Sequence, residues 1–396
     1  MDHHPTSVLK IGLFGLALMA SISCSLFTRA PQPTTLPQPG ATDLSALPNP
    51  TEPPEIEIPA PGQPSLDKSH QDSLEVDYLY TSNLITVIYP LYGSILDDFA
   101  VITVTNTGAA PAQVVARSEI TGYTNQAVDT FTIEAGQSVE VRQNPLLIPE
   151  MLDQLNVEKS AQFHIQVTDL VDGEEKLLLD ETGETMIYAR RDFPWSIPGF
   201  SDEEVFELIA AMVMPNDPAV EELIRNAADY GSSGMMWSGY GEHVDDDDGG
   251  VWERLEAIWD AEDDYYDLTY ISTWVSFAPG SVQRIRLPAE VLEQRSGNCI
   301  ELAILFASAA EALDLEAAII GVPGHAYVAV RTDQVNANYY FIETTMIGQA
   351  TFEKAVDRGA QEFEEALPYL DDHSEGYGWV NIWDAREKGI LPLPWH

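Results

Sequence analysis

The chain is poor in cysteine and in basic residues. Two of its 396 residues are cysteine, and 19 Lys and Arg stand against 64 Asp and Glu, which gives a formal net charge of −45. Such a surface repels nucleic acid and anionic headgroups, because neutralising phosphates requires clustered Lys and Arg. The composition therefore argues against a nucleic-acid partner and predicts a solvated acidic surface, with a specific cationic partner as the alternative.

The two cysteines are Cys24 and Cys299. Cys24 lies in a segment typical of an export signal, so the mature fold is predicted to contain no disulfide. A single thiol in an oxidising compartment is a chemical liability, which is easier to explain if the thiol has a function. Cys299 is therefore the first candidate for a nucleophile.

The N-terminal apolar run, residues 11–22 (IGLFGLALMASI), is shorter than the about 20 residues that a membrane-spanning helix needs. Its length and its small residues are typical of a signal peptide, here residues 1–24. Ser23-Cys24 resembles the end of a bacterial lipoprotein signal, which implies lipidation of Cys24 and an extracytoplasmic, membrane-anchored protein. An ordinary cleaved signal, which gives a secreted protein, and an uncleaved anchor are the alternatives.

Residues 25–73 are rich in Pro and Thr. Because Pro lacks a backbone donor and favours polyproline II, we expect a disordered, semi-rigid stalk here. A tether followed by a spacer suits a domain that is held away from a bilayer.

Residues 74–192 consist of short β-rich runs separated by turn signals such as Asn106-Thr107-Gly108 and Asp172-Gly173. The expected strands are residues 84–89, 99–105, 114–119, 130–133, 138–141, 163–168, 176–179 and 185–189. Roughly eight strands in a segment of this length predict an all-β antiparallel sandwich with an immunoglobulin-like outline. It serves as a spacer or as a binding platform, and the sequence leaves both open.

From residue 195 to 396 the apolar pattern becomes helical and then mixed, which predicts an α+β domain. A capping-box pattern at residues 201–204 (SDEE) precedes an apolar run that begins at Val205. Two further helices are expected over residues 218–229 and 251–260.

Four consecutive carboxylates, Asp245, Asp246, Asp247 and Asp248, lie in a Gly-rich loop. Ca²⁺ favours oxygen ligands, so this run is a weak candidate calcium site. Consecutive residues do not all converge on one ion, and the spacing is not that of an EF-hand loop. We therefore expect an acidic loop, and no metal or cofactor elsewhere.

The strongest chemical pattern surrounds Cys299. A helix is expected from Cys299 to about residue 313, with Asn298 as its N-cap, and a helix N-terminus favours a thiolate. Strands are expected over residues 317–322, 326–330 and 339–343. His325 follows a Pro-Gly turn as the candidate base, and Glu343 ends the next strand, where a carboxylate can orient an imidazole.

This order resembles the transglutaminase-like superfamily of the papain-like cysteine fold. The resemblance rests on R-x-G-x-C over residues 295–299, Glu301, GHAYV over residues 324–328, and the acid followed by Thr at residues 343–344. It implies that Cys299 attacks an amide or ester carbonyl, that His325 shuttles protons and that Glu343 orients His325. The family's acid is usually Asp, so Glu343 is a departure.

The predicted protein is therefore a cell-surface thiol enzyme that performs acyl transfer or hydrolysis on protein or peptide amides. A catalytically silent binding or assembly module of the same superfamily is the alternative. The backbone N–H of Cys299 is the expected oxyanion donor. Gln283 and Gln294 are further candidates, and Trp274 is a candidate for the wall of the cleft.

Overall fold

The structure, a computed structural model, describes residues 73–152, 154–241, 248, 250–272, 282–334 and 338–392, together with the backbone of residues 9–10. The predictions for Cys24, for the stalk up to residue 72, for Trp274 and for Asp245, Asp246 and Asp247 lie outside the described residues, as does the predicted signal peptide apart from residues 9–10. None of the helices within the described residues has the length and apolar character needed to cross a membrane.

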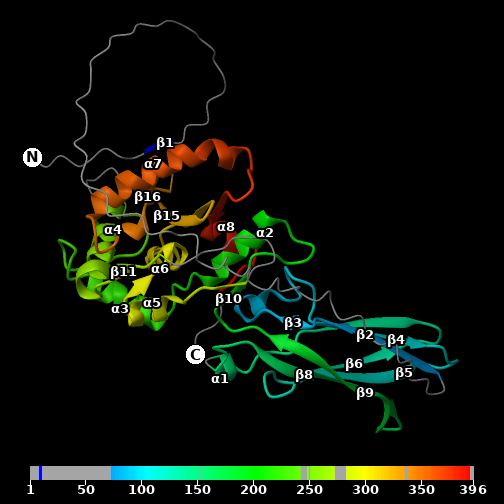
Figure 1. The fold of residues 1–396 in the computed structure, drawn as a ribbon. Helices are drawn as coiled ribbons and strands as arrows, with labels where there is room; N and C mark the ends of the chain where they lie inside the picture. Colours follow the sequence, from blue (N-terminus) through cyan, green and yellow to red (C-terminus); the bar gives the residue numbers. More distant parts are fainter. Residues whose placement is uncertain are drawn as a thin grey trace, which may run out of the picture.

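Residues 73–194 have mostly strands among their regular elements and are called the β region below. Its two sheets have the orders β2-β4-β7 and β3-β9-β8-β5-β6, and they form an elongated lobe in Figure 1. The strands are β2 (Leu74–Tyr80), β3 (Asn83–Leu84), β4 (Ala100–Asn106), β5 (Ala112–Ile120), β6 (Ala127–Ile133), β7 (Ser138–Gln143), β8 (Lys159–Val171) and β9 (Glu174–Ile187). Helix α1 (Pro149–Leu152) joins β7 to β8.

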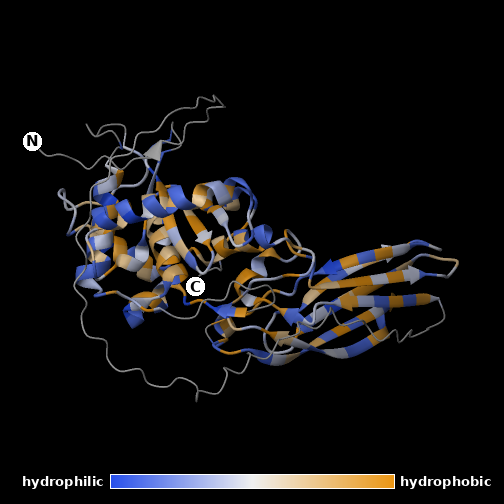
Figure 2. Ribbon diagram, turned by 45° about the horizontal axis from the view of Figure 1, so that its top comes forward, coloured by the Kyte–Doolittle hydropathy of each residue, from blue (hydrophilic) through white to orange (hydrophobic). Residues whose placement is uncertain are grey.

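One core lies between these two sheets. Ile102 of β4, Val114 of β5 and Phe163 of β8 are all fully buried in it. Along β4, buried and partly exposed residues alternate strictly, because successive side chains of a strand point to opposite faces. Figure 2 shows the same alternation of apolar and polar residues along the strands of this lobe.

Three of the predicted strands differ in the structure. The strand expected over residues 84–89 is wrong beyond β3, because Thr86–Leu91 forms the 3-10 segment η2, which contains Pro90. Pro cannot donate to a sheet ladder, and the buried side chains of η2 serve two cores instead. Val87 and Leu91 pack in the core of the C-terminal region, whereas Tyr89 packs in the β region, so η2 joins the two parts.

The runs expected at residues 176–179 and 185–189 instead fall in one continuous strand, β9, which ends at Ile187. Gly183 lies between them and does not end the strand. A Cβ atom at Gly183 would collide with the Tyr80 ring, so the glycine makes room for an aromatic side chain of the facing sheet.

Residues 195–392 are called the α/β region and, together with β1 from the N-terminal end, form the sheet β1-β16-β15-β14-β17. Its strands are β1 (Leu9–Lys10), β14 (Ala317–Val322), β15 (His325–Arg331), β16 (Asn338–Ile342) and β17 (Gly378–Asn381), all antiparallel to their neighbours. Two pairs of short strands also occur: β10 (Asp192–Pro194), at the end of the β region, pairs with β12 (Val282–Arg284), and β11 (Thr269–Tyr270) pairs with β13 (Ser296–Gly297). The chain is thus mixed α+β, as predicted.

Helices cover both faces of this sheet, and Figure 1 shows α6 and α7 on opposite sides of it. The elements are α2 (Asp202–Glu207), η3 (Leu208–Met212), α3 (Pro218–Ala227), α4 (Val251–Asp260), the π-helix η4 (Ala261–Tyr265), α5 (Pro288–Gln294), α6 (Cys299–Ala312), η5 (Thr344–Met346), α7 (Phe352–Asp371) and α8 (Ile382–Glu387). Val328 of β15 packs in the α6 core, whereas Tyr327 packs with Phe363 of α7. Helix α7 has no counterpart among the elements predicted from the sequence.

Asp248, the described member of the acidic run, caps a helix. Its carboxylate accepts hydrogen bonds from the backbone N–H groups of Gly250 (2.9 Å) and Trp252 (3.0 Å) at the start of α4. It also accepts one from the Tyr340 hydroxyl, at 2.7 Å. These donors give Asp248 a structural function at a helix N-terminus, where a negative charge is favourable.

Glu262 in η4 gives a prediction about stability. It is 2% exposed, and its Oε1 atom has no hydrogen-bond partner among the described residues. Burial raises the pKa of this carboxyl well above its usual range. Above about pH 4.3 the Glu262 carboxyl keeps its proton in the folded protein but loses it in the unfolded chain. The free energy of unfolding should therefore fall as the pH rises above about 4.3.

Replacing Glu262 with Gln removes this loss. We expect Glu262→Gln to match the wild type near pH 4 and to exceed it in free energy of unfolding at pH 7.5, with the gap growing by up to about 1.4 kcal/mol per pH unit. Urea denaturation at both pH values measures it. Glu293→Gln, at an exposed Glu, is the matched control. A gap that does not change between the two pH values would contradict the prediction.

Candidate active site

Cys299 is the first residue of α6, as predicted, and its thiol is not part of a disulfide among the described residues. The helix start is fixed by a reciprocal pair of hydrogen bonds. The Glu301 N–H donates to Asn298 Oδ1 (3.1 Å), and the Asn298 N–H donates to Glu301 Oε2 (3.0 Å). This capping box satisfies two backbone donors that a helix start would otherwise leave unpaired.

Arg286 holds this start from outside the helix. Its guanidinium donates from Nε to Glu301 Oε1 (3.0 Å) and from Nη2 to Glu301 Oε2 (2.6 Å), and its backbone N–H donates to Oε1 (2.9 Å). The two side chains are 12% and 4% exposed. Glu301 therefore joins a buried ion pair to the cap beside Cys299, a function that the sequence reasoning did not assign.

The loop before Cys299 is pinned by a short parallel pairing of β11 with β13. The Thr269 N–H donates to the Arg295 carbonyl (3.1 Å), and the Ile271 N–H donates to the Gly297 carbonyl (2.9 Å). A Cβ atom at Gly297 would lie 2.8 Å from the Leu302 side chain. The glycine is thus required for the close approach that brings the loop into α6.

His325 and Glu343 are brought together by adjacent strands. His325 opens β15, and Glu343 directly follows β16. The His325 Nε2 atom lies 2.7 Å from Glu343 Oε2, and the carboxylate is almost completely buried. The other oxygen, Oε1, accepts hydrogen bonds from the Thr345 N–H (3.0 Å) and hydroxyl. Each oxygen of Glu343 thus has its own donor, which fixes the carboxylate.

The electrostatics favour a charged pair. Burial disfavours the imidazolium form of His325, but interactions with Cys299, Glu343 and Glu362 outweigh it and raise the pKa of His325 above its usual value. Burial also opposes ionisation of Glu343, yet its contacts with His325 hold the pKa of this carboxyl below its usual range. The structure thus joins His325 to Glu343 by a hydrogen bond, and Cys299 acts on the same imidazole.

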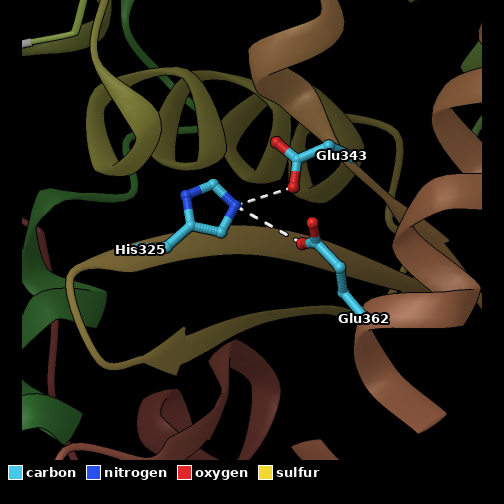
Figure 3. Close-up of side chains that lie close together, drawn as sticks. All are labelled: His325, Glu343 and Glu362. Carbon is cyan, nitrogen blue, oxygen red and sulfur yellow. Dashed lines mark hydrogen bonds and ion pairs between the residues drawn. The ribbon is translucent and has the colours of Figure 1, made fainter. Parts of the chain in front are cut away.

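A second carboxylate that the sequence did not reveal lies at the same nitrogen. Glu362 of α7 places its Oε2 atom 3.5 Å from His325 Nε2, while its Oε1 atom lies 2.6 Å from Nη2 of Arg358. Figure 3 shows both carboxylates on the Nε2 side of the ring, with Nδ1 on the opposite side. The ligand atoms of His325, Glu343 and Glu362 lie within 4.8 Å of one another, a spacing that a metal ion could also use. An ion there would have to displace the hydrogen bond between His325 and Glu343.

The candidate oxyanion side chains have other partners. Gln283 Oε1 accepts a hydrogen bond from Trp195 Nε1 (2.9 Å), and Gln294 Oε1 accepts one from Arg286 Nη1 (2.9 Å). These contacts hold the Gln283 amide against Trp195 and the Gln294 amide against Arg286. The backbone N–H of Cys299 at the helix start stays the preferred oxyanion donor.

Comparison with known families agrees with this geometry. Residues 287–371 match the model of the Transglutaminase-like superfamily, so the predicted resemblance is confirmed for the segment that carries Cys299, His325 and Glu343. This part of the α/β region is transglutaminase-like. No curated protein is similar enough to the chain to count as a match.

Three solved structures show weak similarity. A protein from Archaeoglobus fulgidus has 11% identity and a TM-score of 0.19, and the aligned part covers 30% of this chain and 88% of that chain. The cupredoxin domain of amoB from Nitrosocaldus yellowstonii has 11% identity and a TM-score of 0.21, with 34% and 100% covered. A candidate cysteine protease from Cytophaga hutchinsonii has 13% identity and a TM-score of 0.22, with 61% and 73% covered. Scores this low establish neither a shared fold nor a function.

Proposed function

We propose that this protein is an exported thiol enzyme that transfers or hydrolyses acyl groups of protein or peptide amides. Cys299 is the nucleophile, His325 the proton carrier and Glu343 the acid that orients His325. The observation that supports this assignment is the hydrogen-bonded pair of His325 and Glu343. Cys299 acts on the same imidazole and begins a helix in a transglutaminase-like segment. Peripheral features of the proposal are an immunoglobulin-like sandwich over residues 74–192, a catalytic domain over residues 195–396 and a lipid anchor at Cys24.

The chemistry follows from these positions. The Cys299 thiolate attacks the amide carbonyl carbon, and the oxyanion that forms is stabilised by the Cys299 N–H. The carbon–nitrogen bond then breaks, and the leaving amine takes a proton from the His325 imidazolium. A thioester at Cys299 remains. Water or a second amine attacks it and gives up a proton to His325. The carbon–sulfur bond then breaks, which releases the acid or the new amide and restores the Cys299 thiolate.

One observation favours the alternative of a silent binding module. Cys299 is 3% exposed, and a nucleophile must reach a carbonyl carbon. A small, buried thiol that starts an apolar helix is otherwise an ordinary core residue. Its interaction with the His325 imidazole is what separates Cys299 from that class, so the decisive measurement is whether a covalent acyl intermediate forms.

We expect a thioester to accumulate at Cys299 when the protein is mixed with a peptide library and quenched in acid. Mass spectrometry of the digested protein locates the adduct, and Cys299→Ser should abolish it. Adding a labelled primary amine separates the two reactions, since incorporation of the amine identifies transfer and its absence, with turnover, identifies hydrolysis. A protein that forms no adduct and turns over no peptide is the silent module.

A further inference from the structure

The position of Glu362 is fixed by the packing of α7 on β16. Gly359 lies against the backbone of Phe341, where a Cβ atom would come within 2.5 Å of the carbonyl carbon and oxygen. Phe363 stacks on the Phe341 ring with centroids 3.9 Å apart, and the Glu343 N–H donates to the Ala355 carbonyl at 3.0 Å. The glycine therefore lets the helix come close enough for Glu362 to reach His325.

Glu362 is also held from its other side. Arg358, one turn earlier on α7, lies 2.6 Å from its Oε1 atom, so Oε2 is left to face the imidazole. Figure 3 shows Glu362 extending from α7 toward the ring, beside Glu343. The carboxylate is 16% exposed, which makes its field at His325 stronger than that of a surface charge.

The charged and titratable groups that face His325 come from each element packed around it. They are Cys299 of α6, Tyr327 of β15, Glu343 after β16, and Glu362 with its partner Arg358 on α7. Burial, and then the charges of Glu362 and Glu343, raise the pKa of the Tyr327 hydroxyl, so it stays neutral. Two carboxylates therefore act on one imidazole, and one of them is balanced by an arginine.

We propose that Glu362 is a positioning residue for His325, a second carboxylate that fixes the ring and holds its positive charge. This inference rests on the proposed function and goes beyond the Cys299, His325 and Glu343 triad. Glu343 accepts the short hydrogen bond and sets the ring orientation. Glu362 lies 3.5 Å from the same nitrogen, so the Nε2–H group points between two acceptors. Its negative charge also stabilises the imidazolium while the Cys299 thiolate attacks the carbonyl carbon.

The first consequence is electrostatic. An opposite charge within about 4–6 Å favours the charged form of a group, typically by one to three pH units. Removing the charge of Glu362 should therefore move the loss of the imidazolium proton to lower pH. A residue that only packed α7 onto the sheet would leave this titration unchanged.

The test follows the ring of His325 directly. In protein labelled with ¹⁵N-histidine, the ring nitrogen shifts distinguish imidazolium from the neutral tautomers, and His325→Ala assigns the signals. We expect Glu362→Gln to lower the pH at which His325 becomes neutral by about one pH unit or more. Glu365→Gln, which removes a charge from the exposed face of the same helix, should leave it unchanged.

A second comparison covers the case in which the wild-type ring stays charged throughout the accessible pH range. The titration of His325 in Glu343→Gln is compared with that in Glu343→Gln/Glu362→Gln. Of the two carboxylates at Nε2, the single variant retains Glu362 and the double variant retains neither. Equal titrations within both comparisons would overturn the inference. A wild-type His325 that is already neutral at pH 7 would instead count against the thiolate–imidazolium pair of the proposed function, so the two failures are distinguishable.

Discussion

Replacing His325 with alanine is expected to remove the Cys299 thiolate at pH 6. The proposed function requires the imidazolium, held charged by buried Glu343, to stabilise a thiolate at Cys299. Without the imidazole, ionisation should move to the range of an ordinary thiol, about 8.5, and the thiolate fraction at pH 6 should drop below about 1%. The effect is on the order of a hundredfold.

Thiolate absorbance near 240 nm suits this measurement, because it does not require a reagent to reach a thiol that is 3% exposed. Each spectrum is taken as the difference from the matching Cys299→Ser protein, which cancels Cys24 and the tyrosines. Glu343→Gln keeps an acceptor for Nε2 but loses the charge, and it should give an intermediate shift. If the His325→Ala titration overlays the wild type, the thiolate–imidazolium pair does not exist.

The sequence predicted the local elements of the α/β region well. The helix expected at Cys299 and the strand expected over residues 317–322 occur at those positions. The capping box predicted at residues 201–204 is also present. In each case the signal lies within a few neighbouring residues: an N-cap, an apolar period or a turn. Such patterns are local, so they need no knowledge of what packs against the element.

The failures involve contacts between distant segments. Residues 84–89 have strand composition, yet residues 86–89 belong to the 3-10 segment η2, whose side chains are buried in two cores. Tertiary packing overrode the local preference here. A strand assignment from composition assumes one buried face, whereas η2 is buried on several sides.

The candidate site was predictable for the three residues in family order and not for their supports. Glu362 stands in an acidic run of α7 (QEFEEALP), where its carboxylate cannot be told from its solvated neighbours. It contacts a residue 37 positions earlier, at His325, through a helix that the sequence reasoning did not include. In the sequence, Arg286 cannot be distinguished from an ordinary arginine in a loop. Only the fold shows that its guanidinium donates hydrogen bonds to Glu301. Only the tertiary arrangement reveals which charges are buried.

The largest effect on stability is expected at that buried pair. Arg286→Leu leaves Glu301, which is 4% exposed, without its counter-charge. Breaking a buried ion pair by removing one partner typically costs about 3–5 kcal/mol, because the remaining charge stays desolvated. We therefore expect the free energy of unfolding, measured by urea denaturation, to fall by about that amount. The pair Arg117–Glu175 on the β region supplies the control, since it has similar bidentate geometry in a more exposed setting.

Arg117→Leu should lower stability far less than Arg286→Leu, because solvent screens the exposed pair and hydrates the glutamate that is left. If both variants lost the same free energy of unfolding, burial would not explain the contribution of the Arg286–Glu301 pair to stability. Two replacements of Glu301 then separate the charge from the cap. Glu301→Gln can still accept from the Asn298 N–H, as glutamine does in capping boxes, whereas Glu301→Leu cannot. The difference between them should be about 1 kcal/mol, the usual magnitude of a cap.

The double variant Arg286→Leu/Glu301→Leu completes the cycle. It contains neither charge, so it should be more stable than Arg286→Leu alone while still lacking the acceptor for Asn298. Its thiolate titration tests the link between stability and site, because Asn298 and Glu301 define the helix start at Cys299. If the double variant regains stability but ionises Cys299 at higher pH, the buried pair holds the helix start in the geometry that the thiolate needs. If stability and ionisation both return, the arginine serves only to neutralise Glu301.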